Sequence, residues 1–197
     1  MPDAMRILWL LRHGETPWTL LGRHTGRTDV PLTPRGERQA AALRRRLTGQ
    51  TFALVLTSPL LRARETCRLA GYAGGAELEP DLVEWDYGAY EGRTSAEIRA
   101  EQPGWTIWQA GAPGGETPGD VGLRVDRVIA RAQEASGDVA LFAHGHLLRV
   151  LAARWIGLPP SAGGSVALET ASVSMLGLER EQRVICHWNE VCHLEDE

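Results

Sequence analysis

Arginine and histidine side chains that suit chemistry on a phosphate group recur along the sequence. Arg12 and His13 are adjacent, Arg62 comes later, and His144 and His146 flank a glycine. A guanidinium group pairs with two phosphate oxygens at once, and a neutral imidazole can act as a nucleophile or as a base. Phosphoryl transfer depends mainly on positioning and on charge stabilisation. A neutral His13 beside two guanidinium groups therefore suits attack on a clamped phosphorus atom, which would form a phosphohistidine.

Buried strands must position these side chains. Apolar runs over residues 7–11 and 52–57, and a third in DVALFAH up to His144, indicate strands, and polar residues stand at the carboxyl end of each run. Helical patterns cover 35–47, 58–69 and 145–157. This alternation predicts an α/β fold, a three-layer α/β/α arrangement with a largely parallel central sheet. Because ligands bind outside the carboxyl ends of such strands, the distant polar residues should meet in one crevice.

Three predicted helices begin with a hydroxyl residue followed by proline, at Thr33, Ser58 and Thr117. Each hydroxyl can cap free backbone amides, and proline fits the first helical turn. We expect the helices after Ser58 and near Gly145 to point free amides into the crevice, where they would favour an anion. Two short strands are predicted around the turn at 179–182.

Composition limits the classes of protein to consider. The 197 residues suit one domain spanning 1–197, with a small insertion near 77–117 after the second helix. The net charge of −4 gives no sign of a nucleic-acid partner. No apolar run approaches the roughly 20 residues of a membrane helix, and no secretory signal is apparent, so we expect a cytoplasmic protein without a membrane partner. The three cysteines lack metal-type spacing, and the oligomeric state is not predicted.

Four motifs together resemble a known family. LLRHGET, TSPLLRARET, EWDYGAYEG and FAHGH occur in this order and are similar to motifs of the histidine phosphatase superfamily, the phosphoglycerate-mutase-like proteins. The resemblance implies that His13 is the phosphorylated nucleophile and that Arg12 and Arg62 clamp the phosphate. It also implies that His144 hydrogen-bonds the phosphoryl group and that Glu84 is the general acid.

The resemblance further implies the residues that bind the substrate. Thr25 and Gly26 match a loop that closes on the substrate. Tyr87 matches an aromatic residue beside the substrate, and Gly145 matches a backbone donor. Thr19 stands where mutase members often carry asparagine. His24 is expected at the rim of the pocket and His146 in or behind its wall. The substrate-binding candidates are therefore Thr19, His24, Thr25, Gly26, Tyr87, Gly145 and His146.

The chain is most similar to the acid-phosphatase and sedoheptulose-bisphosphatase-like branch. Its segment 92–114 is short and holds only Arg93 and Arg99 as basic residues, whereas mutases carry a longer, more basic insertion. The expected activity is that of a phosphoric monoester hydrolase of the histidine acid phosphatase type. Its substrate would be a small phosphorylated metabolite, of the sugar phosphate or phosphoglycerate type, and neither metal nor cofactor is implied.

Several alternatives stay open. The chain could be a phosphoglycerate mutase, or a non-catalytic phosphate-binding module on the same fold. A metal-dependent hydrolase would use the His-x-His pair at 144–146, but no supporting carboxylate cluster lies near it in the sequence. For the general acid, Asp86, Glu91 and Glu116 compete with Glu84. Glu116 lies either at the capped start of a helix or in the crevice.

Overall fold

A mixed six-stranded sheet forms the centre of the protein, seen in a computed structural model that describes residues 7–194. Its spatial order is β3-β2-β4-β1-β5-β6. The strands are β1 (Leu8–Arg12), β2 (Leu54–Thr57), β3 (Ala76–Leu78), β4 (Val139–Ala143), β5 (Val173–Glu179) and β6 (Gln182–Glu190). The pairings β3–β2, β2–β4 and β4–β1 are parallel, and β1–β5 and β5–β6 are antiparallel. The predicted α/β class is confirmed, and the C-terminal hairpin makes the sheet mixed.

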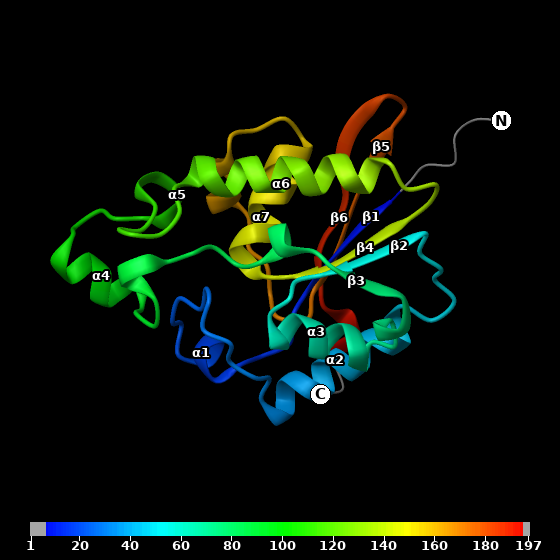
Figure 1. Ribbon diagram of the computed structural model, residues 1–197, viewed down its shortest axis with the longest axis horizontal. Helices are drawn as coiled ribbons and strands as arrows, with labels where there is room; N and C mark the ends of the chain where they lie inside the picture. The colour runs from blue at the N-terminus through cyan, green and yellow to red at the C-terminus, as the bar shows by residue number, and fades with distance from the viewer. Residues whose placement is uncertain (1–6, 195–197) are drawn as a thin grey trace.

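Helices cover both faces of the sheet, which completes the three predicted layers. Figure 1 shows α6 and α7 on one face and α2 and α3 on the other, with α1, α4 and α5 beyond one end of the sheet. The helices are α1 (Pro17–Leu20), α2 (Pro34–Arg46), α3 (Leu61–Leu69), α4 (Ser95–Glu101), α5 (Ile107–Ala110), α6 (Pro118–Gln133) and α7 (Gly145–Trp155). Short 3-10 turns at 73–75, 80–82, 88–90, 160–165 and 192–194 connect them.

Strand β1 shows why the apolar runs are continuous. Leu8 and Leu10 pack in the apolar cluster beneath α6 and α7, whereas Trp9 and Leu11 pack in the cluster beneath α2 and α3. Successive side chains of a strand point to opposite faces, so a strand covered on both sides must be apolar at every position. The polar residues that follow are then placed at the carboxyl edge of the sheet.

Two of the three predicted helix starts are confirmed. The Thr33 hydroxyl accepts from Gly36 N at 3.0 Å, and Thr117 forms a reciprocal capping box with Asp120. The expectation for Ser58 is wrong, because α3 begins at Leu61 and has no side-chain cap of its own.

The segment 77–117 folds largely as short helices and turns, although β3 already begins at Ala76. Within residues 7–194, no helix is long and apolar enough to span a membrane.

Candidate active site

His13 lies directly after β1 with its imidazole fixed in one tautomer. Its backbone N–H donates to Ala143 O at 3.0 Å, and its Nδ1 lies 2.7 Å from Gly14 O. A carbonyl oxygen only accepts, so the ring proton is on Nδ1 and the lone pair is on Nε2. Burial, followed by the charges of Arg62 and Arg12, lowers the pKa of His13 well below its ordinary value. The imidazole is therefore neutral, as a nucleophile requires.

Arg12 presents an unsatisfied donor at the same place. Its Nη1 donates to Leu168 O, while its Nε is buried without a hydrogen-bond partner in the described part of the chain. A Cβ atom at Gly145 would lie 3.2 Å from both Nε and Cζ of Arg12, so a larger residue would require the guanidinium to shift by a few tenths of an ångström. A buried donor left unpaired is costly, and a ligand oxygen would satisfy it.

Arg62 and His144 form a layer behind His13. Arg62 is fully buried and donates from Nε to His144 Nδ1 at 3.2 Å. Since the guanidinium can only donate, the proton of neutral His144 must be on Nε2, which then donates to Ser58 Oγ at 2.8 Å. Burial and the Arg62 charge lower the pKa of His144 well below its ordinary value. The rings of His13 and His144 have centroids 5.2 Å apart.

The remaining N–H groups of Arg62 are directed at backbone and do not line the cleft. Nη1 donates to Thr28 O at 3.0 Å, and Nη2 donates to Thr25 O at 2.9 Å and Gly26 O at 3.0 Å. Arg62 therefore contributes its charge beside His13 while it fixes the loop at 25–28.

Glu84 occupies the N-terminus of α7, which corrects one expectation from the sequence. Its carboxylate accepts from the backbone amides of Trp85 at 2.9 Å, His146 at 3.0 Å and Leu147 at 2.9 Å. At the start of α3, the amide of Leu61 donates to Asp29 Oδ1 at 2.7 Å. The amides of His146, Leu147 and Leu61 thus bind carboxylates of the protein itself, whereas Gly145, the first residue of α7, lines the cleft and stays the predicted backbone donor.

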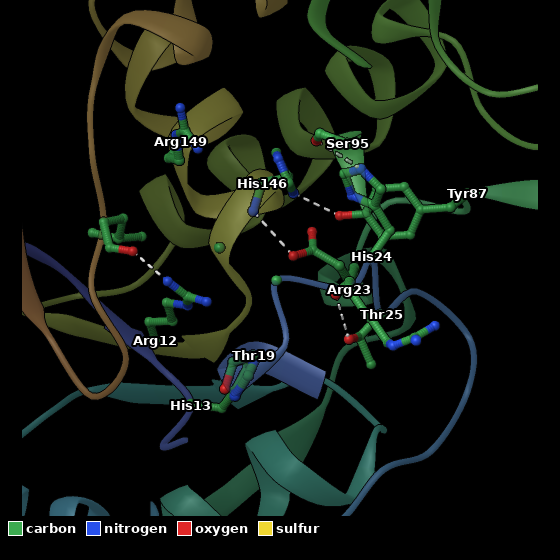
Figure 2. A pocket seen from close by; sticks show the side chains of 14 residues that line it. Arg12, His13, Thr19, Arg23, His24, Thr25, Tyr87, Ser95, His146 and Arg149 are labelled. Atoms are coloured by element: carbon green, nitrogen blue, oxygen red, sulfur yellow. Dashed lines mark hydrogen bonds between the residues drawn. The ribbon is translucent and has the colours of Figure 1, made fainter. Parts of the chain in front are cut away.

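A cleft of about 250 Å³ opens above His13. Figure 2 shows Arg12 and His13 at one end of it and Arg149, His146 and Ser95 toward the other. The cleft is lined by Arg12, His13, Thr19, Gly22, Arg23, His24, Thr25, Glu84, Tyr87, Ser95, Gly145, His146, Arg149 and Leu168.

Most of the predicted substrate-binding residues line this cleft. Gly26 does not, because its amide donates to Glu91 Oε1 at 2.9 Å and its carbonyl accepts from Arg62. Thr19 lines the cleft, but its hydroxyl is engaged in the turn at Thr16, accepting from the amide at 2.9 Å and donating to the carbonyl at 2.8 Å.

One wall of the cleft is polar but uncharged. The rings of His24 and Tyr87 stack with centroids 4.7 Å apart, and the Tyr87 hydroxyl shares a 2.6 Å hydrogen bond with His146 Nδ1. Burial lowers the pKa of His24 to about 4 and that of His146 well below its ordinary value. Burial also raises the pKa of Tyr87 well above its ordinary value. This wall can therefore form hydrogen bonds to a ligand without adding charge.

The structure separates Glu84 from its competitors. Asp86 pairs with Arg27 at 2.7 Å, Glu91 binds the amide of Gly26, and Glu116 pairs with Arg124. Glu84 is the one carboxylate among the cleft-lining residues.

Glu116 and Arg124 instead hold the segment that carries Glu84. Arg124 is 6% exposed and donates from Nη1 to Asp81 O and Val83 O at 2.8 and 2.6 Å. Its Nη2 donates to Glu84 O at 3.2 Å and its Nε to Glu116 Oε1 at 2.7 Å. The sequence reasoning missed Arg124, since these contacts span about 40 residues of chain and leave no local pattern.

Arg149 and Ser95 are cleft residues that the sequence reasoning did not single out. Arg149 lies three residues after His146 and four after Gly145, so the three share one face of α7. That helical spacing was a usable signal. Ser95 carried none, because it is brought to the cleft, beside His24 Nε2 at 3.2 Å, by a segment 71 residues further along the chain.

His144 and His146 point to different partners, Ser58 and Tyr87 respectively. Within residues 7–194, no three His, Cys, Asp or Glu side chains are grouped so that they could hold a metal ion.

The fold and the residues around His13 define the class of protein. The chain belongs to the histidine phosphatase superfamily (branch 1), whose family model matches residues 8–191. It is 43% identical to an acid phosphatase of Mycobacterium tuberculosis over 185 residues, covering 89% of this chain and 88% of that protein. It is 38% identical to sedoheptulose 1,7-bisphosphatase of Saccharomyces cerevisiae over 191 residues, covering 80% of this chain and 70% of that protein. These relatives confirm the resemblance predicted from the motifs.

The fold is also shared with a solved structure. A protein encoded by an open reading frame of Mycobacterium tuberculosis superposes with a TM-score of 0.90 at 39% identity. The superposition covers 94% of this chain and 98% of that one, so the two proteins share the fold over nearly their whole length.

Proposed function

We propose that this protein is a metal-independent phosphatase that hydrolyses small phosphomonoesters through a phosphohistidine on His13. The observation that carries the proposal is the pairing of two groups at one end of the cleft. His13 Nε2 holds a lone pair on a neutral ring, and the Nε of Arg12 is a buried donor without a partner. Together they fit a nucleophile facing a bound phosphoryl group.

The first step transfers the phosphoryl group. His13 Nε2 attacks phosphorus, the bond from phosphorus to the ester oxygen breaks, and the leaving oxygen takes a proton from Glu84. Arg12 binds the phosphoryl oxygens, while the buried charge of Arg62 keeps His13 neutral and offsets the phosphate charge. His144 lies beside His13, with its Nε2–H on Ser58 Oγ, and would hydrogen-bond the phosphoryl group only by exchanging this partner.

The second step regenerates the enzyme. Glu84, now ionised, accepts a proton from a water molecule as that water attacks the phosphohistidine. The bond between Nε2 and phosphorus breaks, and inorganic phosphate leaves. Every proton and bond is accounted for by the residues of the cleft and one water molecule.

Hydrolysis is favoured over mutase transfer by the cleft and by the relatives above 30% identity, whereas relatives at 29% identity are named probable phosphoglycerate mutases. Both relatives described above are phosphatases. Arg93, one of the two basic residues of segment 92–114, pairs with Glu101 and is not part of the cleft lining. The sugar phosphate or phosphoglycerate class of substrate and the cytoplasmic location stay predictions.

Phosphate release from sugar phosphates, phosphoglycerates and an aryl phosphate, measured with EDTA present, tests the proposal. His13→Ala should reduce release to the level of a protein-free sample, and wild-type protein quenched during turnover should carry one phosphoryl group on His13 by mass spectrometry. His187→Ala removes an exposed histidine on β6 and serves as the matched control. Release that requires a divalent metal, or that persists in His13→Ala, would contradict the mechanism. Isomerisation of 3-phosphoglycerate without phosphate release would favour the mutase.

A further inference from the structure

Arg149 is a cation in the cleft that lacks a negative partner. Its Nε donates to Gly163 O at 2.9 Å and its Nη2 to Gly164 O at 3.3 Å, and its guanidinium lies 4.3 Å from the ring centre of Trp108. No carboxylate in the described part of the chain forms an ion pair with it. Neutral groups therefore hold the guanidinium in a fixed position and leave its charge available.

The contrast with the same helix is informative. Arg154, five residues further along α7, is paired with Asp126 through two hydrogen bonds of 2.9 Å. A guanidinium that loses part of its hydration is stabilised when an anion replaces the water. Arg154 has this anion within the protein, whereas Arg149 faces a cleft.

The surroundings of Arg149 suit a polar, negatively charged group. Burial lowers the pKa of His146 and of His24, so both rings are neutral. They can hydrogen-bond a ligand but form no ion pair with it, which leaves the anionic group to Arg149. Arg23 adds a second guanidinium at the cleft, held by Gly92 O at 2.5 Å. It also has no ion pair among residues 7–194.

Arg149 is separated from the reacting end of the cleft. In Figure 2 it lies across the cleft from His13, with Arg12 between them. A volume of about 250 Å³ accommodates a small metabolite whose one end is the phosphoryl group and whose other end reaches Arg149.

We propose that Arg149 binds a second anionic group of the substrate, a carboxylate or a second phosphate, while the first phosphate reacts at His13. The preferred substrates are then phosphomonoesters with a further negative charge. This inference rests on the proposed function, because it assigns the far end of the same cleft.

Two matched pairs of compounds test the role of Arg149. 3-Phosphoglycerate and glycerol 3-phosphate differ by a carboxylate, and fructose 1,6-bisphosphate and fructose 6-phosphate differ by a phosphate. kcat/KM is measured for all four and for an aryl phosphate, in wild type, Arg149→Met and the control Arg154→Met. Dissociation constants for the same pairs are measured by calorimetry in a His13→Ala background, where no turnover is needed.

We expect at least one anion-bearing compound to exceed its partner by about tenfold or more in kcat/KM and in affinity, as a charge-assisted hydrogen bond would give. Arg149→Met should remove most of that preference, with a smaller loss for the aryl phosphate because that compound has no second anion, and Arg154→Met should keep the preference. The pair that responds identifies the anion as carboxylate or phosphate.

The inference is overturned if wild type prefers neither anion-bearing compound, or if Arg149→Met weakens both members of each pair equally. A wild-type protein that hydrolyses nothing, including the aryl phosphate, would contradict the proposed function instead. The calorimetric pairs would still decide whether Arg149 binds an anion.

Discussion

Acid should destabilise the folded protein, and His24 should account for a measurable share of the loss. This side chain is 7% exposed, and burial, with a smaller effect from the charge of Arg99, lowers its pKa from 6.5 to about 4. Between these pH values His24 is protonated in the unfolded chain and neutral in the folded protein. The free energy of unfolding therefore rises with pH through this window. The contribution is fully present above pH 6.5 and is lost as the pH falls toward 4.

The size of the effect follows from the pKa. A fall from 6.5 to about 4 corresponds to about 3 kcal/mol of stability at neutral pH that disappears in acid. Within the window the slope from one histidine is about 1.4 kcal/mol per pH unit. His13, His144 and His146 also have lowered pKa values, so the wild-type slope should be steeper still.

Urea unfolding of wild type and His24→Gln at several pH values between about 7.5 and about 4.5 measures this share. The glutamine cannot titrate, so its stability should fall less steeply than that of wild type, by about 1.4 kcal/mol per pH unit. His187→Gln, at an exposed position on β6, is the control and should keep the wild-type slope. Equal slopes for wild type and His24→Gln would refute the reasoning, because they would mean that burial of this ring does not exclude its proton.

Three further changes probe the cleft and the segment that carries Glu84. Glu84→Gln should lower kcat on alkyl phosphates by about 10²-fold or more but spare an aryl phosphate, since only a poor leaving group needs the proton, and equal losses on the two substrates would assign the acid role elsewhere. Arg124→Met should cost about 3 kcal/mol in urea unfolding, because Glu116 loses its buried partner, and the double variant with Glu116→Gln should recover part of that loss; a cost within error of zero would contradict this account. Gly145→Ala should raise KM and weaken inhibition by inorganic phosphate, since the new Cβ would lie 3.2 Å from Arg12 Cζ. Unchanged phosphate inhibition would mean that Arg12 adjusts without leaving the phosphate.

The sequence predicts well those features that depend on neighbouring residues. The apolar run before Arg12 requires burial on both faces, and the structure places it in the centre of the sheet. Thr33 and Thr117 cap the helices that begin immediately after them. Ser58 fails because Pro59 and Leu60 precede the first helical turn and because Asp29, from a distant loop, caps the helix instead.

The sequence is a poorer guide to the hydrogen-bond partners that each arginine of the site takes. Arg62 was expected to clamp phosphate, yet two of its nitrogens hold carbonyl groups of residues 25–28. Arg149 was overlooked, although it lies on the same helical face as Gly145. The Arg62 partners lie 34 to 37 residues away in the chain and no local spacing predicts them, whereas the helical spacing of Arg149 could have indicated its place in the cleft.

The use of the α7 N-terminus explains how the site can hold an acid and an anion side by side. Two amides of that helix bind the carboxylate of Glu84, and Arg124 fixes its backbone carbonyl from behind. A helix N-terminus given to a carboxylate is no longer available to phosphate. With the amides of His146 and Leu147 taken, guanidinium groups meet most of the negative charge of the substrate, and Arg12 at one end and Arg149 at the other are both in the cleft lining. The division of donors, amides for the acid and guanidinium groups for the substrate, lets Glu84 and the phosphate occupy one cleft without sharing donors, and it makes arginine the determinant of what the cleft accepts.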